Sequence, residues 1–268
     1  MFPPGSTLKP FVAMAGLKEG VVDGTHTAVS CGGFFRLPGS SHRYYCWRRS
    51  GHGREDVLGA IAQSCDVFFY TITRALGIER FYQDLSYFGF GQVSGIDLQG
   101  EKRGVLPDPA WKKRRYNQVW YPGETVIAGS GQGYNLTTPL QLARATAMIA
   151  NNGLAVQPHV GMQVWDPLSG QKARLRFDPP KRIPYAPESF SLVRQGMELV
   201  VTGGTATNIR GGPVSIAGKT GTAQVAKIRR DASGRALNSG VHRLKDHALF
   251  IAYAPVEAPK IAVAVIVE

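Results

Sequence analysis

Three stretches of the chain carry the apolar spacing and the end signals of helices. The first follows Pro3-Pro4, and its apolar run predicts a helix over Gly5–Leu17. The second has helical spacing over Arg54–Leu76. The third starts at Thr138-Pro139, where a cap residue precedes a proline at the first helical position, and it ends at Asn151-Asn152-Gly153.

The last quarter of the chain has the pattern of strands. A short strand is predicted over Lys219–Val225, and two longer apolar runs, His247–Ala254 and Lys260–Val267, are joined through the turn Pro255–Pro259. Between the first two helices, Val21–Arg54 is rich in Gly, Ser, aromatic and basic residues, and we interpret it as an irregular excursion. The pattern predicts an α+β fold in which a helical cluster packs against an antiparallel sheet.

Length and composition indicate a globular protein. A chain of 268 residues with 43% hydrophobic and 19% charged residues is long enough to bury a sizeable core. Its longest uninterrupted apolar stretch, Ile261–Val267, is too short to cross a bilayer. The first residues lack the ordered charged, apolar and small-residue regions of a signal peptide, so none is predicted in this chain.

The chain is strongly basic, with a formal net charge of +12. Clusters such as Arg48-Arg49 and Lys112–Arg115 suit nucleic acid, an anionic membrane surface or an acidic polymer, and they equally suit solvated loops. No zinc finger, aromatic RNA-binding motif or basic heptad helix accompanies the charge. We therefore expect no nucleic acid among the partners.

Ser6 and Lys9 are spaced so that both lie on one face at the start of the first predicted helix. A serine hydroxyl becomes a useful nucleophile when an adjacent base removes its proton, and a lysine can be that base where its pKa is lowered. The exposed N–H groups of a helix start can also stabilise an oxyanion. The pair is a candidate nucleophile and base, although this spacing alone is common.

Two further motifs support a catalytic role for Ser6 and Lys9. Ser64 and Asp66 form S-x-D inside the second predicted helix, and Lys219, Thr220 and Gly221 form K-T-G on the predicted strand. In chain order the three motifs are S-x-x-K, S-x-D and K-T-G, the set of active-site-serine enzymes that interact with penicillin, with Asp in place of the usual Asn. Three ordered motifs at long separations outweigh the alternative in which Ser64 caps a turn and Lys219 is a solvated charge.

The chain resembles the transpeptidase domain of class B penicillin-binding proteins, and most closely the elongation-type group, penicillin-binding protein 2. The likeness covers nearly the whole chain, and Asp66 itself resembles what elongation-type members often carry. It rests on PPGSTLKPF, LPGS with RYYCW, SGHGREDV, SCDVFFY, FGFGQVSGIDL, WYPGETVIAGSGQGYNLTTPLQLARA, GKTGTAQV and DHALFIAYAP. The resemblance implies a penicillin-binding or β-lactamase-like fold and no organic cofactor.

The resemblance also implies a peptidoglycan D,D-transpeptidase with a role for each motif. Ser6 would attack the carbonyl between the last two D-alanines of a wall stem peptide, with Lys9 as general base. Ser64 would relay the proton to the leaving amine, and Lys219 would keep a cation near Lys9. An amine of a second stem peptide would then resolve the acyl-enzyme into a cross-link, whereas β-lactams would acylate Ser6 and remain.

The substrate would lie along the K-T-G strand by the same resemblance. Thr220 and Thr222 would offer hydroxyls to its terminal carboxylate, and Gly221 would let the peptide add to the sheet as a further strand. The backbone N–H groups of Ser6 and Thr222 would hold the oxyanion.

Other functions share these motifs. A class A β-lactamase or a β-lactam-sensing receptor carries the same front motifs, but a deacylating E-x-x-L-N-like loop is missing from the sequence. A non-catalytic scaffold for wall-synthesis partners is the alternative of another class, with the basic surface docking on acidic material.

Relatives in this family carry parts that this sequence lacks. They have an N-terminal membrane anchor, a pedestal domain and the first strands of the catalytic sheet before the serine motif, and a helix after the final strand. We therefore expect residues 1–268 to be a partial transpeptidase domain, truncated at both ends. The natural protein is expected at the periplasmic face of the bacterial inner membrane with a membrane glycosyltransferase as partner, and Lys260–Val267 to be a bare apolar edge in this chain.

Three cysteines, Cys31, Cys46 and Cys65, lie close together in the sequence, with His52 between the second and the third. One disulfide with a spare thiol, or three buried small residues, would explain them. The alternative is a closed and therefore structural zinc site of three thiolates and one imidazole. Its position favours the metal, because Cys65 lies between Ser64 and Asp66 and a metal there would hold the excursion against the helix of the active site.

The resemblance supports the same four ligands. Some elongation-type relatives use Asp, His and Cys ligands around a zinc in this region, and the segments GGFFRLPGS and RYYCW align Cys31 and Cys46 with matching places. His26 and His42 compete for the imidazole position, but the SGHG context of His52 matches the family better.

Overall fold

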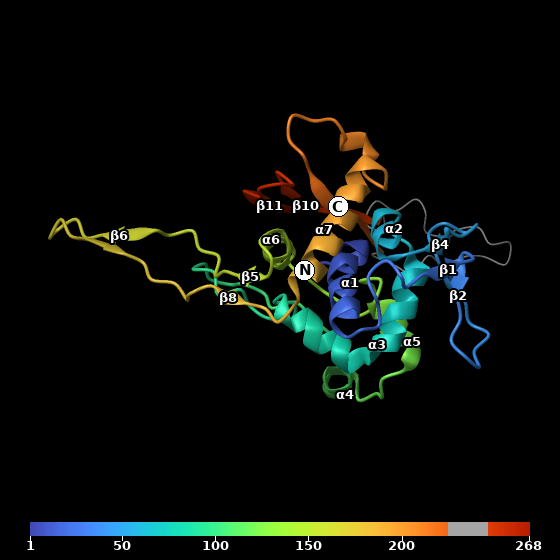
Figure 1. Cartoon of the computed structure of the whole chain (residues 1–268). Helices are drawn as coiled ribbons and strands as arrows, with labels where there is room; N and C mark the ends of the chain where they lie inside the picture. Colours follow the sequence, from blue (N-terminus) through green and yellow to red (C-terminus); the bar gives the residue numbers. More distant parts are fainter. Residues whose placement is uncertain (225–245) are drawn as a thin grey trace.

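The computed structural model describes residues 1–224 and 246–268, and it confirms the predicted α+β fold (Figure 1). The main sheet has three antiparallel strands in the order β11-β10-β9. They span Ala217–Ala223 in β9, His247–Ala254 in β10 and Ile261–Val267 in β11. The two long predicted strands are thus confirmed, whereas Val225, the predicted end of the first, lies outside the described residues.

Seven helices of the described chain cluster beside this sheet. α6 packs against β11 and β10, α7 packs against β9 and α2, and α1 lies between α3 and α7 (Figure 1). All residues of α1 from Lys9 to Gly16 are buried, as expected of a helix surrounded by other elements. The bounds are α1 Lys9–Lys18, α2 Val57–Ala62, α3 Asp66–Tyr87, α4 Pro109–Tyr116, α5 Pro122–Ala128, α6 Pro139–Ala150 and α7 Pro187–Thr202.

The helix predicted at Thr138-Pro139 is confirmed, and its start has a local cause. The Thr138 hydroxyl accepts the Gln141 N–H at 3.1 Å, and the Gln141 side chain accepts the Thr138 N–H at 3.0 Å. This reciprocal pair satisfies two N–H groups that a helix start leaves without partners. The helix predicted over Gly5–Leu17 is also present, as a short 3₁₀ turn, η1 (Gly5–Leu8), followed by α1.

The single helix predicted over Arg54–Leu76 is wrong, because the chain breaks between α2 and α3 at Ser64. Ser64 adopts a left-handed conformation with φ 56°. Its N–H donates to the Ile61 carbonyl, and the N–H of Cys65 donates to the Ala60 carbonyl. This pair of bonds ends a helix in the manner usually seen with glycine. Ser64 is therefore in the turn between two helices.

The excursion Val21–Arg54 contains more regular structure than the sequence predicts. β1 (Val29–Cys31) pairs with β4 (Gly53–Glu55), and β2 (Phe34–Phe35) pairs with β3 (Tyr44–Tyr45). The strands are too short for their side chains to show an alternating pattern in the sequence. The prediction of an irregular segment is therefore wrong in part.

A hairpin projects from the body of the molecule (Figure 1). It consists of β6 (Gln163–Trp165) and β7 (Lys172–Arg174), and β5 (Leu154–Ala155) pairs with β8 (Lys181–Arg182) at its base. A 3₁₀ turn, η2 (Thr207–Ile209), follows α7. None of the helices in the described part of the chain combines the length and the apolar character needed to cross a membrane.

Candidate active site

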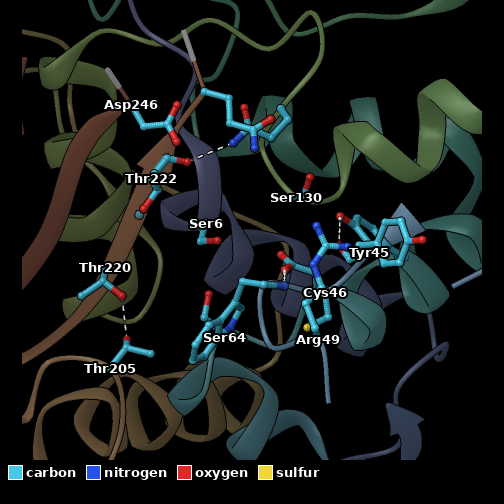
Figure 2. Close-up of a pocket in the computed structure, with 16 residues that line it drawn as sticks. Ser6, Tyr45, Cys46, Arg49, Ser64, Ser130, Thr205, Thr220, Thr222 and Asp246 are labelled. Atoms are coloured by element: carbon cyan, nitrogen blue, oxygen red, sulfur yellow. Dashed lines mark hydrogen bonds between the residues drawn. The ribbon is translucent and has the colours of Figure 1, made fainter. Parts of the chain in front are cut away.

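A cavity of about 650 Å³ lies where η1, the junction of α2 and α3, and strand β9 meet (Figure 2). It brings together residues from all three sequence motifs, including Ser6, Ser64 and Thr220. Sixteen residues line it: Ser6, Tyr45, Cys46, Trp47, Arg49, Ser64, Asp66, Tyr70, Ser130, Gln132, Thr205, Thr220, Gly221, Thr222, Gln224 and Asp246.

Ser6 lies in η1, which packs directly on β9. Gly5 has a positive φ of 52°, and a side chain there would collide with the carbonyl of Thr222. Glycine is therefore required for the turn that brings the Ser6 backbone next to Thr222, where the predicted oxyanion site would form. The Gln132 side chain donates to the same Thr222 carbonyl at 2.9 Å and ties β9 to the loop after α5.

Lys9 is fully buried at the floor of the site. Its Nζ donates to the Ser64 carbonyl at 2.8 Å, to Ser64 Oγ at 3.1 Å and to Asp66 Oδ1 at 2.6 Å. All three acceptors belong to the second motif. Among the described residues, Lys9 Nζ has no hydrogen bond to Ser6 Oγ, and the predicted base is thus held by the second motif.

Asp66 connects the catalytic floor to the excursion. Its Oδ1 accepts from Lys9, and its Oδ2 accepts the backbone N–H of Trp47 at 2.8 Å. An asparagine has one acceptor oxygen at this position, whereas the carboxylate serves two donors at once. The departure from Asn therefore has a structural effect, because it holds Lys9 and the Trp47 backbone with a single side chain.

Lys219 lies buried beneath the K-T-G strand. Burial and then the nearby charge of Lys9 lower its pKa well below the ordinary value of a lysine, and its Nζ donates to the Thr220 carbonyl at 2.9 Å. Thr220 and Thr222 line the cavity, as Figure 2 shows. Within the described chain β9 pairs only with β10, so its other edge is free to accept a further strand.

Several cavity residues had no role assigned from the sequence. Ser130 and Gln132 lie in the SGQG turn after α5, and the Thr205 hydroxyl is 2.6 Å from the Thr220 hydroxyl. Trp47 and Tyr70 enter the cavity from the excursion and from α3. The Gly-rich SGQG turn is the one local signal that could have pointed to this wall, because no fixed spacing links these residues to the motifs.

The four predicted metal ligands come together beside the cavity. The ligand atoms of Cys31, Cys46, His52 and Cys65 all lie within 4.8 Å of one another, and the three cysteines are free thiols. His52 Nδ1 is 3.6 Å from the sulfur of Cys31 and 3.5 Å from that of Cys46. Neither competitor joins them, because His26 is exposed beside Asp23 and His42 packs on Tyr44.

The spacing of these atoms fits a tetrahedral zinc ion. Bonds of about 2.3 Å to sulfur and about 2.0 Å to nitrogen at tetrahedral angles place the two ligand atoms about 3.5 Å apart. A hydrogen bond from Cys65 lowers the pKa of the Cys46 thiol to about 5, whereas the same contact and burial raise the pKa of Cys65. A lower thiol pKa favours the thiolate, the form that binds metals.

Comparison with known proteins places the chain in a family. The model of the penicillin binding protein transpeptidase domain matches residues 1–268. A peptidoglycan D,D-transpeptidase MrdA of Acinetobacter baumannii is 42% identical over all of this chain and 39% of its own length. The chain thus spans about two fifths of that curated relative.

Solved structures agree with this assignment. A structure of Pseudomonas aeruginosa PBP2 in complex with WCK 5153 matches all of this chain and 54% of its own, with a TM-score of 0.85 and 40% identity. A penicillin-binding protein PBP2 from Helicobacter pylori matches all of this chain and 45% of its own, with a TM-score of 0.81 and 32% identity. With the three motifs around one cavity, these matches show that the chain belongs to the penicillin-binding protein transpeptidase domain family.

Proposed function

We propose that the protein is a peptidoglycan D,D-transpeptidase that works through an acyl-enzyme on Ser6 and is inhibited by β-lactams. The observation that carries this proposal is the cavity in which Ser6 faces the free edge of β9, with Lys9 and Ser64 hydrogen-bonded at its floor. A nucleophile, a buried base and a strand edge for a peptide are what acyl transfer from a peptide requires.

In the first step a stem peptide adds along β9, and its terminal carboxylate meets the hydroxyls of Thr220 and Thr222. Ser6 Oγ forms a bond to the carbonyl carbon of the last peptide bond, and its proton passes to the amine of Lys9, the proposed general base. Ser64, bonded to Lys9 at 3.1 Å, passes a proton to the amine as the C–N bond breaks and D-alanine leaves. The products are an ester on Ser6 and a free amino acid.

In the second step the amine of another stem peptide attacks this ester. The amine loses its proton to Lys9 by way of Ser64, the Ser6 Oγ–carbon bond breaks, and Ser6 regains a proton. Asp66 accepts a hydrogen bond of 2.6 Å from Lys9 Nζ and so holds this amine beside Ser64.

A fluorescent penicillin tests the proposal, because a β-lactam acylates the same serine. We expect a covalent band on a denaturing gel for the wild-type chain and none for Ser6→Ala. Thr7→Ser is a matched control, since it changes the neighbouring hydroxyl residue. A labelled Ser6→Ala variant would contradict the assignment, and an unlabelled wild type would favour a non-catalytic scaffold.

We also propose that Cys31, Cys46, His52 and Cys65 hold a structural zinc ion. A zinc ion bound by four protein ligands has no open position, so it would supply structural cross-linking and no reacting group. Support comes from the sulfur–nitrogen distances and from Cys65, which adjoins both Ser64 and Asp66. Metal analysis of protein purified without a histidine tag tests this, and less than a half-equivalent of zinc in folded protein would contradict it.

The proposed reaction implies a cellular location and a partner for the protein. We place it at the periplasmic face of the bacterial inner membrane, where stem peptides are cross-linked, with a membrane glycosyltransferase as partner. One similar structure from Helicobacter pylori is a complex of PBP2 with MreC, and another concerns a peptidoglycan synthase complex. Co-purification with such a glycosyltransferase from membranes tests the partner.

A further inference from the structure

The cavity has a second wall that the reaction above leaves without a role. In Figure 2 Thr220 and Thr222 lie on one side of Ser6, and Tyr45 and Arg49 lie on the other. Of the described residues that line the cavity, Arg49 is the one cation. No described carboxylate lies within 4.0 Å of its guanidinium, and the nearby Asp66 already serves Lys9 and Trp47.

The backbone of Arg49 is fixed by the fold. It lies in the loop between Cys46 and His52, which is closed by the 3.5 Å approach of their side chains. Within this loop the Gly51 N–H donates to the Arg48 carbonyl at 3.0 Å, and the Cys46 N–H donates to the Gly33 carbonyl at 2.9 Å. Gly33 packs so closely on the Arg49 carbonyl that any side chain there would collide with it. These contacts fix the position of the loop backbone.

The side chain of Arg49 is also oriented. Its guanidinium carbon lies over the Tyr45 ring, 3.9 Å from the ring centre, and no described residue accepts a hydrogen bond from the guanidinium. Tyr45 is in turn held by the hydroxyl of Tyr70, which donates to its carbonyl at 3.3 Å. The Trp47 indole donates to the Gln63 carbonyl at 3.0 Å and ties the same wall to the end of α2.

We propose that Arg49, which lies over the Tyr45 ring, is a subsite for a side-chain carboxylate of the peptide that acylates Ser6. This inference rests on the proposed transpeptidase function. Successive side chains of a peptide that adds to the edge of β9 point to opposite faces of the sheet. Those on the cavity side extend towards the wall opposite β9. A planar guanidinium with free N–H edges matches a carboxylate through two parallel hydrogen bonds. The subsite selects acidic stem peptides.

The test compares two synthetic peptides that end in D-Ala-D-Ala and differ at the preceding residue, which carries a side-chain carboxylate in one and the corresponding amide in the other. The measured quantity is kcat/KM for release of D-alanine by the purified full chain. We expect the wild type to favour the carboxylate peptide about tenfold, because a charge-assisted bidentate pair discriminates strongly. Arg49→Gln abolishes this preference, and Arg49→Lys retains part of it.

Arg48→Gln is the matched control, because it removes the same charge from the neighbouring residue, which does not line the cavity. It should keep the wild-type preference. An equal preference in wild type and Arg49→Gln, or an equal loss in Arg48→Gln, would show a solvated surface charge only and overturn the subsite. Penicillin labelling of the wild type separates failure of the subsite from failure of the proposed function. Labelled protein without a peptide preference refutes the subsite alone. Unlabelled protein refutes the proposed function and the subsite with it.

Discussion

The two walls of the cavity are ordered by different means. β9 pairs with β10 over seven residue pairs, Ala217–Ala223 with His247–Tyr253, so its position is set by a continuous backbone ladder. The opposite wall, Tyr45–Arg49, has a single two-residue pairing, β2 with β3, and depends on side chains gathered around His52. The position of one wall is therefore set by the sheet, and that of the other by the four-residue cluster and a few separate hydrogen bonds.

The largest effect on penicillin acylation is expected from substitution of Lys9, at the floor of the cavity. Lys9→Ala should lower the rate of penicillin acylation by about 10² to 10⁴-fold, because general base catalysis contributes that much. Its amine also holds Ser64 and Asp66 at the floor of the cavity. Rapid-mixing kinetics with fluorescent penicillin measure the loss. Lys18→Ala, a lysine at the other end of the same helix, is the control and should retain the wild-type rate.

The Tyr45–Arg49 wall should lose its order selectively when the proposed zinc ligands are replaced. Cys46→Ser and His52→Ala should lose zinc and slow penicillin acylation by about 10 to 100-fold, because the wall that holds Asp66 through the Trp47 N–H becomes loose. Limited proteolysis should then cut near residues 45–52 and leave β9 intact. The His42→Ala variant, which alters a nearby imidazole outside the cluster, should behave as wild type. Unchanged acylation in a zinc-free Cys46→Ser protein would contradict the dependence.

Lys219, on the β9 side of the cavity, is a buried amine that lowers the free energy of unfolding. We expect Lys219→Met to lose acylation but to raise the free energy of unfolding at pH 7 by about 1–3 kcal/mol, because a buried amine is replaced by an apolar chain of similar size. The pKa of Lys219 is lower in the folded chain than in the unfolded one, so the unfolded chain binds more protons at pH values between the two. The stability of the wild type therefore rises with pH towards its ordinary pKa of 10.5, and the advantage of the variant shrinks. Thermal melts at pH 7 and pH 9.5 measure both effects.

The smallest effect is expected at the other edge of the sheet. In β11 Val263 and Val265 face outward and are 37% and 49% exposed, whereas Ala262 and Ala264 pack on the core. An exposed apolar edge favours association of chains, so this chain should be poorly soluble. Val265→Lys should raise the soluble fraction and change stability by less than about 0.5 kcal/mol, because surface substitutions have small effects. Ala264→Lys, on the packed face, is the control that should destabilise. A monodisperse wild-type chain would contradict the prediction.

Much of the fold was accessible from local signals. The cap pair Thr138 and Gln141 lies within one helical turn, and the runs His247–Ala254 and Ile261–Val267 are long enough for their strand character to be visible. The break at Ser64 was missed, because serine is an unusual residue for a left-handed helix end and the surrounding apolar spacing is continuous. Ser130 and Gln132 were missed for another reason, since their place in the cavity depends on contacts with residues far along the chain.

Residue chemistry and short-range periodicity are enough to identify the three ordered motifs and the class of fold, and the resemblance to the family adds the four residues that cluster beside the site. The connections between these residues depend on tertiary packing. It directed Lys9 to Ser64 and Asp66, shared Asp66 with the Trp47 backbone, and placed Arg49 opposite β9. These relations join residues about 20 to 170 positions apart, and contacts of that range are set by packing of whole elements, which no local pattern encodes.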